Sequence, residues 1–273
     1  MNYRAKYLLI LFFLSLFAGY DLLAVAASSH RKKERLSEYV NPFIGASTNV
    51  RKARAGHGLG KTFPGATTPW GMAQVSPNTI TGGDNGPGYS DEHTTIEGFA
   101  LTQMSGIGWY GDLGNFLVMP TTGELFTYLG SEQYPEKGYR SRYDKRSEKA
   151  SAGYYSVFLS DYRIKAELTA TPHCGIMRFT YPKHKQARIQ IDLARRVGGT
   201  STRQYIERVD DRTIRGWMRC TPAGGGWGNG SGKADYTVYF YAQFSCPLKE
   251  YGIWSADIPD NWTRRLGDIG KPE

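Results

Sequence analysis

Apolar and polar side chains alternate along several stretches in the second half of the chain. The clearest stretch is 161–170, where Tyr, Ile, Ala and Leu occupy every second position. A period of two is that of a strand with one buried and one solvated face. The same pattern predicts five further strands, at 155–159, 177–181, 189–193, 214–220 and 236–244.

Turn-forming residues separate these stretches. Thr171-Pro172, Tyr181-Pro182 and Gly198-Gly199 lie between them, and 224–230 is a glycine-rich run. Short strands at this spacing are typical of an antiparallel β-sandwich. We find no internal repeat and no long amphipathic helix. The sequence therefore predicts an all-β fold.

The first half of the chain has a different composition. Residues 41–123 are rich in Gly, Pro, Thr and Asn, and only 71–76 and 116–119 look strand-like. This segment predicts long Gly/Pro-rich loops packed on the sandwich. Long ordered loops on a rigid sheet scaffold are a common place for binding residues.

The N-terminus has the pattern of an export signal. Arg4 and Lys6 precede an apolar run at 8–18, and Ala24-Val25-Ala26 is a small-x-small cleavage pattern. The run is shorter than the roughly 20 residues that span a bilayer. We expect a signal peptide at 1–26, a basic flexible arm at 27–38, and a periplasmic or secreted protein without a membrane attachment after cleavage.

The charge pattern argues against nucleic-acid binding, and the cysteine spacing argues against a zinc site. Lys and Arg number 34 against 25 Asp and Glu, but the basic residues are interleaved with acidic ones and form no basic helix. Nucleic-acid binding is therefore not expected. Cys174, Cys220 and Cys246 lack metal-ligand spacing. We interpret them as small apolar residues on inner strand faces, and one disulfide is the alternative.

Two motifs that suggest catalysis have ordinary explanations. Residues 55–62 look like a phosphate loop, but Ala55 replaces the required glycine and Pro64 follows where a helix should begin. Asp84 and Asp112 could form the carboxylate pair of a small hydrolase. Carboxylates in Gly- and Asn-rich loops more often make local turn hydrogen bonds.

Two glycine-rich loops, at 82–93 and 104–112, combine aromatic and polar residues. Glycine lets a backbone approach a ligand, and Trp and Tyr offer flat faces to sugar C–H groups. Core packing of Trp109 beneath its loop is the alternative. The candidate substrate-binding residues are Asp84, Asn85, Tyr89, Trp109, Tyr110 and Asp112.

The order of motifs from 39 to 246 resembles the N-terminal domain of glycoside hydrolase family 92, the calcium-dependent, inverting exo-α-mannosidases. The resemblance begins at Tyr39-Val40-Asn41-Pro42-Phe43-Ile44-Gly45 and includes Thr62-Phe63-Pro64-Gly65-Ala66-Thr67. It continues through 69–77, 88–89, 98–99, 105–108, 111–112 and 119–121.

The resemblance implies an N-terminal β-sandwich followed by an (α/α)6 barrel. It places the general acid, the general base and most Ca²⁺ ligands in that barrel. No catalytic or metal-binding residue is therefore assigned to this chain, which alone is expected to be inactive. The implied partners are the missing barrel and an α-mannoside glycan. The implied process is the degradation of N-glycans.

The resemblance also bears on the bounds of the domain and on which glycosidic linkage the intact enzyme would cut. It implies a sandwich domain at 39–254 that lacks its last strands, followed by a polar tail or truncated loop at 255–273. Residues 83–87 hold no aromatic residue where members that cut α-1,2 linkages have Trp, so this linkage is not assumed. The alternative function is a stand-alone carbohydrate-binding β-sandwich module.

Overall fold

The computed structural model describes residues 35–46, 62–79, 88–104, 113–131, 133–197, 199–224 and 235–254. The chain divides into two units, Met1–Tyr39 and Val40–Glu273. In the described part of the first unit lies one 3-10 helix, η1 (Leu36–Tyr39), where Arg35 and Glu38 form an exposed ion pair.

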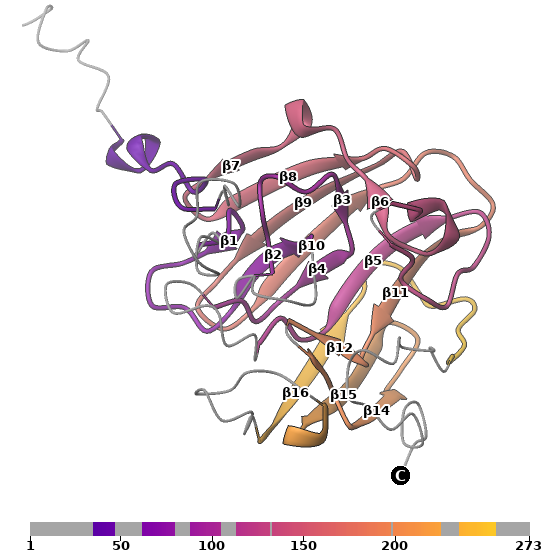
Figure 1. Ribbon diagram of the computed structural model, residues 1–273. Helices are drawn as coiled ribbons and strands as arrows, with labels where there is room; N and C mark the ends of the chain where they lie inside the picture. The colour runs from indigo at the N-terminus through magenta and orange to yellow at the C-terminus, as the bar shows by residue number, and fades with distance from the viewer. Residues whose placement is uncertain are drawn as a thin grey trace, which may run out of the picture. The chain divides into compact units, whose positions relative to one another are not determined.

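The second unit is built from antiparallel sheets, which confirms the all-β prediction (Figure 1). The described residues contain no α-helix; their helical turns in this unit are η3 (Pro135–Lys137), η4 (Lys145–Ser147) and η5 (Pro222–Gly224). The strands are β1 (Ala66–Thr67), β2 (Gln74–Asn78), β3 (Thr95–Ile96), β4 (Gly98–Ala100), β5 (Leu117–Thr122), β6 (Ser141–Arg142), β7 (Lys149–Ser151), β8 (Tyr154–Leu159), β9 (Ile164–Ala170), β10 (Gly175–Thr180), β11 (Ala187–Asp192), β12 (Arg195–Arg196), β13 (Gly199–Thr200), β14 (Arg203–Arg208), β15 (Thr213–Cys220) and β16 (Tyr236–Gln243).

Two of the sheets face each other and enclose the main core. One has the order β1-β2-β4-β5-β11 and the other β10-β9-β8-β7 (Figure 1). Alternate residues of the strands point between the sheets, which is the arrangement of a β-sandwich. Buried side chains from both sheets form this core, among them Val75, Phe99, Met119, Tyr155, Val157, Ile164 and Leu168.

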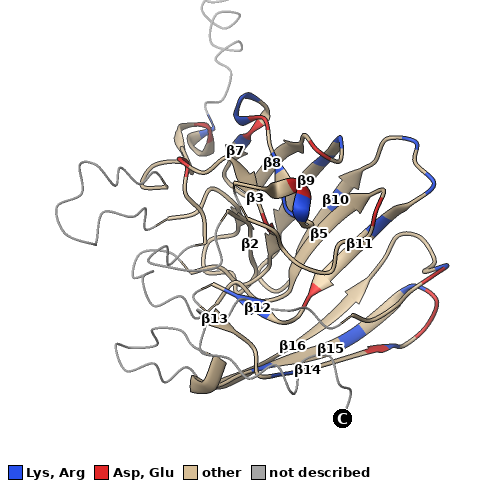
Figure 2. Cartoon of the chain, turned by 45° about the vertical axis from the view of Figure 1, so that its right-hand side comes forward, with Lys and Arg blue, Asp and Glu red and all other residues tan. Residues whose placement is uncertain are grey.

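A third sheet, β14-β15-β16, packs on a second apolar cluster. Its inner side chains include Ile206, Met218 and Val238, and they meet Phe116 and Leu193. Two short pairs, β3-β6 and β12-β13, complete the sheets of the described residues. Figure 2 shows Lys, Arg, Asp and Glu distributed over many strands and turns. Within the described ranges, no helix has the length and apolar character needed to span a bilayer.

The structure corrects two details of the sequence interpretation. The strand predicted from 161 begins at Ile164, because Arg163 has a φ of 56° and ends a turn. Cys220 is buried as expected, but Cys174 and Cys246 are exposed, so the inner-face interpretation is wrong for those two.

Candidate functional site

Most of the predicted substrate-binding residues fall outside the described part of the chain. We call 80–87 the first loop and 105–112 the second loop; neither is described. The residues there are Asp84, Asn85, Trp109, Tyr110 and Asp112, whose roles stay predictions. Tyr89 and the chain on both sides of each loop are described, so the structure defines the frame that carries the two loops.

The frame brings the ends of the two loops to one place. Gly88 ends the first loop and Gly114 lies just after the second, with φ angles of 74° and 83°. A Cβ atom on Gly88 would lie 2.7 Å from Cγ2 of Val197, and one on Gly114 would lie 2.5 Å from the same atom. Asn78 also borders both positions. These φ angles and the lack of room for a Cβ atom require glycine at both positions. The two glycines that follow the loops therefore both pack against Val197.

Hydrogen bonds between polar side chains fix the chain segments that flank the loops. Nε2 of Gln103 donates a 2.5 Å hydrogen bond to Oδ1 of Asn78. Oγ1 of Thr102 donates to Oδ1 of Asn115 at 2.9 Å and accepts from the Asn115 backbone N–H at 2.9 Å. The first bond joins the residue before the second loop to the strand before the first loop, and the other two join the residues on either side of the second loop. The chain segments that flank the loops are therefore connected to one another.

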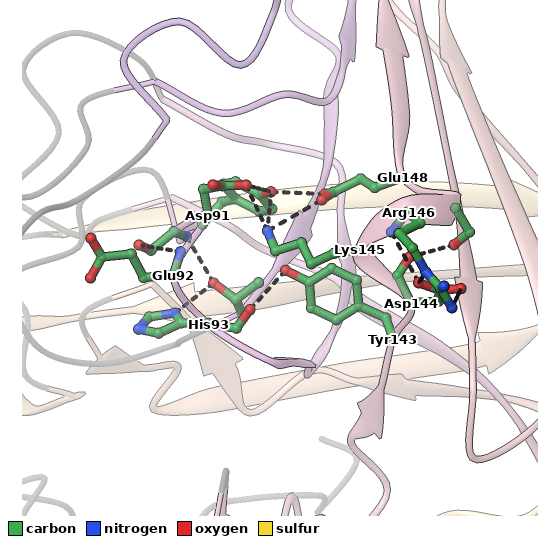
Figure 3. Close-up of polar contacts among 12 residues, drawn as sticks. Asp91, Glu92, His93, Tyr143, Asp144, Lys145, Arg146 and Glu148 are labelled. Atoms are coloured by element: carbon green, nitrogen blue, oxygen red, sulfur yellow. Dashed lines mark hydrogen bonds and ion pairs between the residues drawn. The ribbon is translucent and has the colours of Figure 1, made fainter.

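Tyr89 is fully buried next to the first loop. Its hydroxyl donates a 2.8 Å hydrogen bond to Oε1 of Glu148, which also accepts from the Tyr155 hydroxyl at 2.6 Å. Nζ of Lys145 lies 2.7 Å from Oδ1 of Asp91 and 3.3 Å from Oε2 of Glu148. Figure 3 shows Lys145 pointing between these two carboxylates. The structure thus makes Tyr89 part of an anchor, and substrate contact by Tyr89 stays a prediction.

Burial and charge keep the phenol groups of this anchor neutral near pH 7. Burial, followed by the charge of Glu148, raises the pKa values of Tyr89 and Tyr155 far above the usual range. The same two causes raise the pKa of Tyr143 to about 12. Burial acts to lower the pKa of Lys145, but its hydrogen bond to Asp91 and the charge of Glu148 produce a net rise. The phenols therefore remain neutral donors, and the cluster is suited to holding a loop in place.

The segment after Tyr89 is also held from its other side. Oγ1 of Thr79 lies 2.8 Å from Nδ1 of His93 and accepts a 2.9 Å hydrogen bond from the Ser90 backbone N–H. The Tyr143 hydroxyl donates to the His93 carbonyl at 3.0 Å. Residues 88–93 are therefore fixed both to the end of β2 and to the segment around η4.

Sequence reasoning did not identify Lys145 or Glu148. The segment 143–148 reads as an ordinary charged turn. Its partner Asp91 is 54 residues away along the chain. Only the tertiary fold brings these groups together, and no local pattern of residues marks them.

The described residues do not fit a calcium site. Across the described ranges, no three His, Cys, Asp or Glu side chains come together in a set that could hold a metal ion. Asp91 and Glu148 approach each other, but the ammonium group of Lys145 lies between them. A Ca²⁺ ion needs six to eight oxygen ligands, and the positive charge of Lys145 between these two carboxylates would repel the ion.

Comparisons with known proteins point to one family. A family model of the glycosyl hydrolase family 92 N-terminal domain matches residues 39–268. An uncharacterized secreted glycosidase of Arthroderma benhamiae is 29% identical over 144 residues, which are 53% of this chain and 17% of the relative.

Solved structures of the same family share the fold. A family GH92 α-mannosidase from Bacteroides thetaiotaomicron has a TM-score of 0.70 and 39% identity over 80% of this chain. An inverting mannosidase of the family from Bacteroides thetaiotaomicron VPI-5482 has a TM-score of 0.62 and 25% identity over 84% of it. The chain spans 27% of the length of each of these structures.

Proposed function

Because this chain belongs to glycoside hydrolase family 92, whose N-terminal domain matches residues 39–268, we propose that it is the carbohydrate-contacting domain of an exported, inverting α-mannosidase. Two relatives support the reaction: one is an inverting mannosidase, and an α-mannosidase from Bacteroides thetaiotaomicron was solved in complex with mannoimidazole. The substrate class is an α-mannoside, with N-glycans as the natural source.

The observation that carries the proposal is the common base of the two loops. Gly88 and Gly114 both pack against Val197, and the Lys145–Glu148 anchor holds the segment that begins at Tyr89. A rigid base under two loops rich in aromatic and polar residues suits a pocket wall. The proposed sugar contacts are therefore Asp84, Asn85, Trp109, Tyr110 and Asp112.

The acid and the base of the reaction are assigned to a domain outside this chain. In inversion, one carboxylic acid protonates the leaving oxygen while a second carboxylate activates water on the opposite face of the sugar. The Ca²⁺ expected for the intact enzyme would help hold the mannose there. This chain's part is to bind the leaving-group side of the glycan and to limit the linkages that fit.

Export is part of the same proposal. Residues 1–26 have the pattern of a signal peptide, and one relative is named a secreted glycosidase. We propose a periplasmic or secreted location, with the arm at 27–38 joining the leader to the sandwich.

Two measurements test the division of roles. Purified 27–273 is expected to release no mannose from α-mannobiosides in the presence of Ca²⁺. A hybrid in which 39–254 replaces the matching segment of the Bacteroides α-mannosidase is expected to be active, and Trp109→Ala or Asp112→Asn should lower its kcat/KM. Turnover by 27–273 alone would place the acid and base in this chain and overturn the proposal.

A further inference from the structure

The outer face of the β14-β15-β16 sheet carries a row of aromatic side chains. Tyr205, Trp217 and Tyr239 are direct neighbours in the strand register, one from each strand. The next row holds Glu207, Arg215 and Tyr241. Strands lie about 4.8 Å apart, so the aromatic row extends over roughly 10 Å.

The two faces of this sheet differ in the kind of apolar residue they use. The inner face combines the aliphatic residues Ile206, Met218 and Val238 with aromatic ones, Tyr236 and Phe240, and all of them pack in the core. On the outer face every large apolar residue is Tyr or Trp, and none is Leu, Ile, Val or Met. Tyr239 is 73% exposed and Tyr241 is 68% exposed. An exposed group of aromatic residues in a soluble domain indicates a binding surface.

Neighbouring side chains hold the aromatic row in position. The rings of Tyr205 and Trp217 are nearly parallel, at 15°, with centroids 6.1 Å apart. The Tyr205 hydroxyl donates to Glu207, which also pairs with Arg215. The two rings and the polar groups beside them are therefore ordered before any ligand arrives, which lowers the entropy lost on binding.

We propose that this face binds a chain of neutral pyranose sugars. Trp and Tyr rings can pack against the C–H faces of sugar rings. Tyr205 and Trp217 stack on each other, and Tyr239 beside them is 73% exposed. The side chains of Glu207 and Arg215 can bond to hydroxyl groups at the edge of the row. The row is long enough for more than one sugar ring. This surface uses none of the residues of the two loops, so it is independent of the mannosidase assignment.

The charges around the row favour a neutral ligand. Of the three arginines on this face, Arg215 pairs with Glu207 and Arg219 pairs with Asp235, and Arg203 lies opposite Arg219 in the register. Figure 2 shows basic and acidic positions near one another along β14 and β15. Paired charges provide no strong field for a polyanion. The lack of aliphatic side chains favours a polyhydroxylated ligand over the apolar centre of a protein interface.

Calorimetry on the whole mature chain tests this surface, with linear α-mannotetraose and cellotetraose as probes. At least one probe is expected to bind. Trp217→Ala should raise its Kd about tenfold, and Tyr239→Ser, at a more exposed position, should raise it as well. The matched control is Tyr128→Ala, an exposed Tyr outside this sheet, which should leave Kd unchanged.

Each other outcome has a distinct meaning. Absence of heat with both probes, or a Kd that Trp217→Ala and Tyr239→Ser leave unchanged, overturns the inference. Loss of binding through Trp109→Ala alone would assign the binding to the second loop and also overturn it. None of these results depends on whether the hybrid cleaves mannosides.

Discussion

Lys145 reaches across 54 residues of chain to Asp91 and places its Nζ 2.7 Å from the Oδ1 atom of that carboxylate. The same ammonium group lies 3.3 Å from Oε2 of Glu148. The Asp91 side chain is 47% exposed, whereas that of Glu148 is 3% exposed. One cation therefore serves an exposed and a buried acid, and the buried one depends on it more strongly.

Lys145→Met should destabilise the domain more than Asp91→Asn does. Removing Lys145 leaves the carboxylate of Glu148 buried without its cation, which should cost about 1–3 kcal/mol. Removing the charge of Asp91 affects only a solvated pair, and should change stability by at most about 1 kcal/mol. Urea denaturation of the two variants measures the difference. Equal losses would show that Lys145 acts only through Asp91.

Gly88→Ala and Gly114→Ala should each destabilise the domain by about 2–5 kcal/mol. Part of the loss is the left-handed backbone, which costs a non-glycine residue about 1–2 kcal/mol. The rest is the clash with Val197, because overpacking costs about 1–3 kcal/mol. Gly123 is the matched control, since its φ is 81° and a Cβ there would meet nothing within 4 Å. Gly123→Ala should show the backbone part alone.

A double variant tests the shared neighbour. Adding Val197→Ala to Gly88→Ala or to Gly114→Ala should recover part of the lost stability, because Cγ2 of Val197 is the atom that the new methyl group meets. The same change added to Gly123→Ala should lower stability further, as it does alone. A double-mutant cycle from thermal unfolding gives the coupling. Additive losses for all three glycines would contradict the common base of the loops.

The strands of the second half could be predicted because half-buried strands show their period directly. β8, β10, β11, β15 and β16 lie within a few residues of the alternating stretches. β14 was missed because Tyr205 faces outward, so apolar residues occupy both faces and hide the period. β1, β3 and β4 have two or three residues each, too few for any period to appear.

The candidate site was predictable only in part. Glycine and aromatic content identified the two loops, and the turn geometry that glycine permits explains why their ends carry Gly88 and Gly114. The Lys145–Glu148 anchor could not be found in this way, because a Lys and a Glu in a turn are common on any protein surface. The anchor holds Tyr89 because Glu148 is buried next to the Tyr89 hydroxyl, and that burial depends on how the sheets pack.

Removing the arginine of a buried ion pair beside the main core should lower the free energy of unfolding far more than removing the arginine of a nearby exposed pair. Arg140 and Glu97 are both buried, with Nη2 2.6 Å from Oε1. Arg140→Met should cost about 3–5 kcal/mol, because Glu97 would keep an uncompensated charge. Adding Glu97→Leu should recover much of that loss. Arg142→Met, at a solvated pair with Asp161, is the control and should cost at most about 1 kcal/mol. A double variant less stable than Arg140→Met would contradict this account.

Glu167 should make stability depend on acid pH. Hydrogen bonds from Tyr154 and Lys165, and then Arg178, lower the pKa of Glu167 from 4.5 to about 2. The folded state therefore favours the carboxylate, and this stabilisation is fully present above pH 4.5 and disappears as the pH falls towards 2. Glu167→Gln should lower Tm by roughly 2–4 °C at pH 7, and the gap should close towards pH 2. Glu124→Gln, in an exposed turn, should leave Tm nearly unchanged at each pH. Thermal melts between pH 7 and pH 2 test this prediction. If the difference in Tm between Glu167→Gln and the unchanged chain stayed constant with pH, a lowered pKa at Glu167 would be excluded.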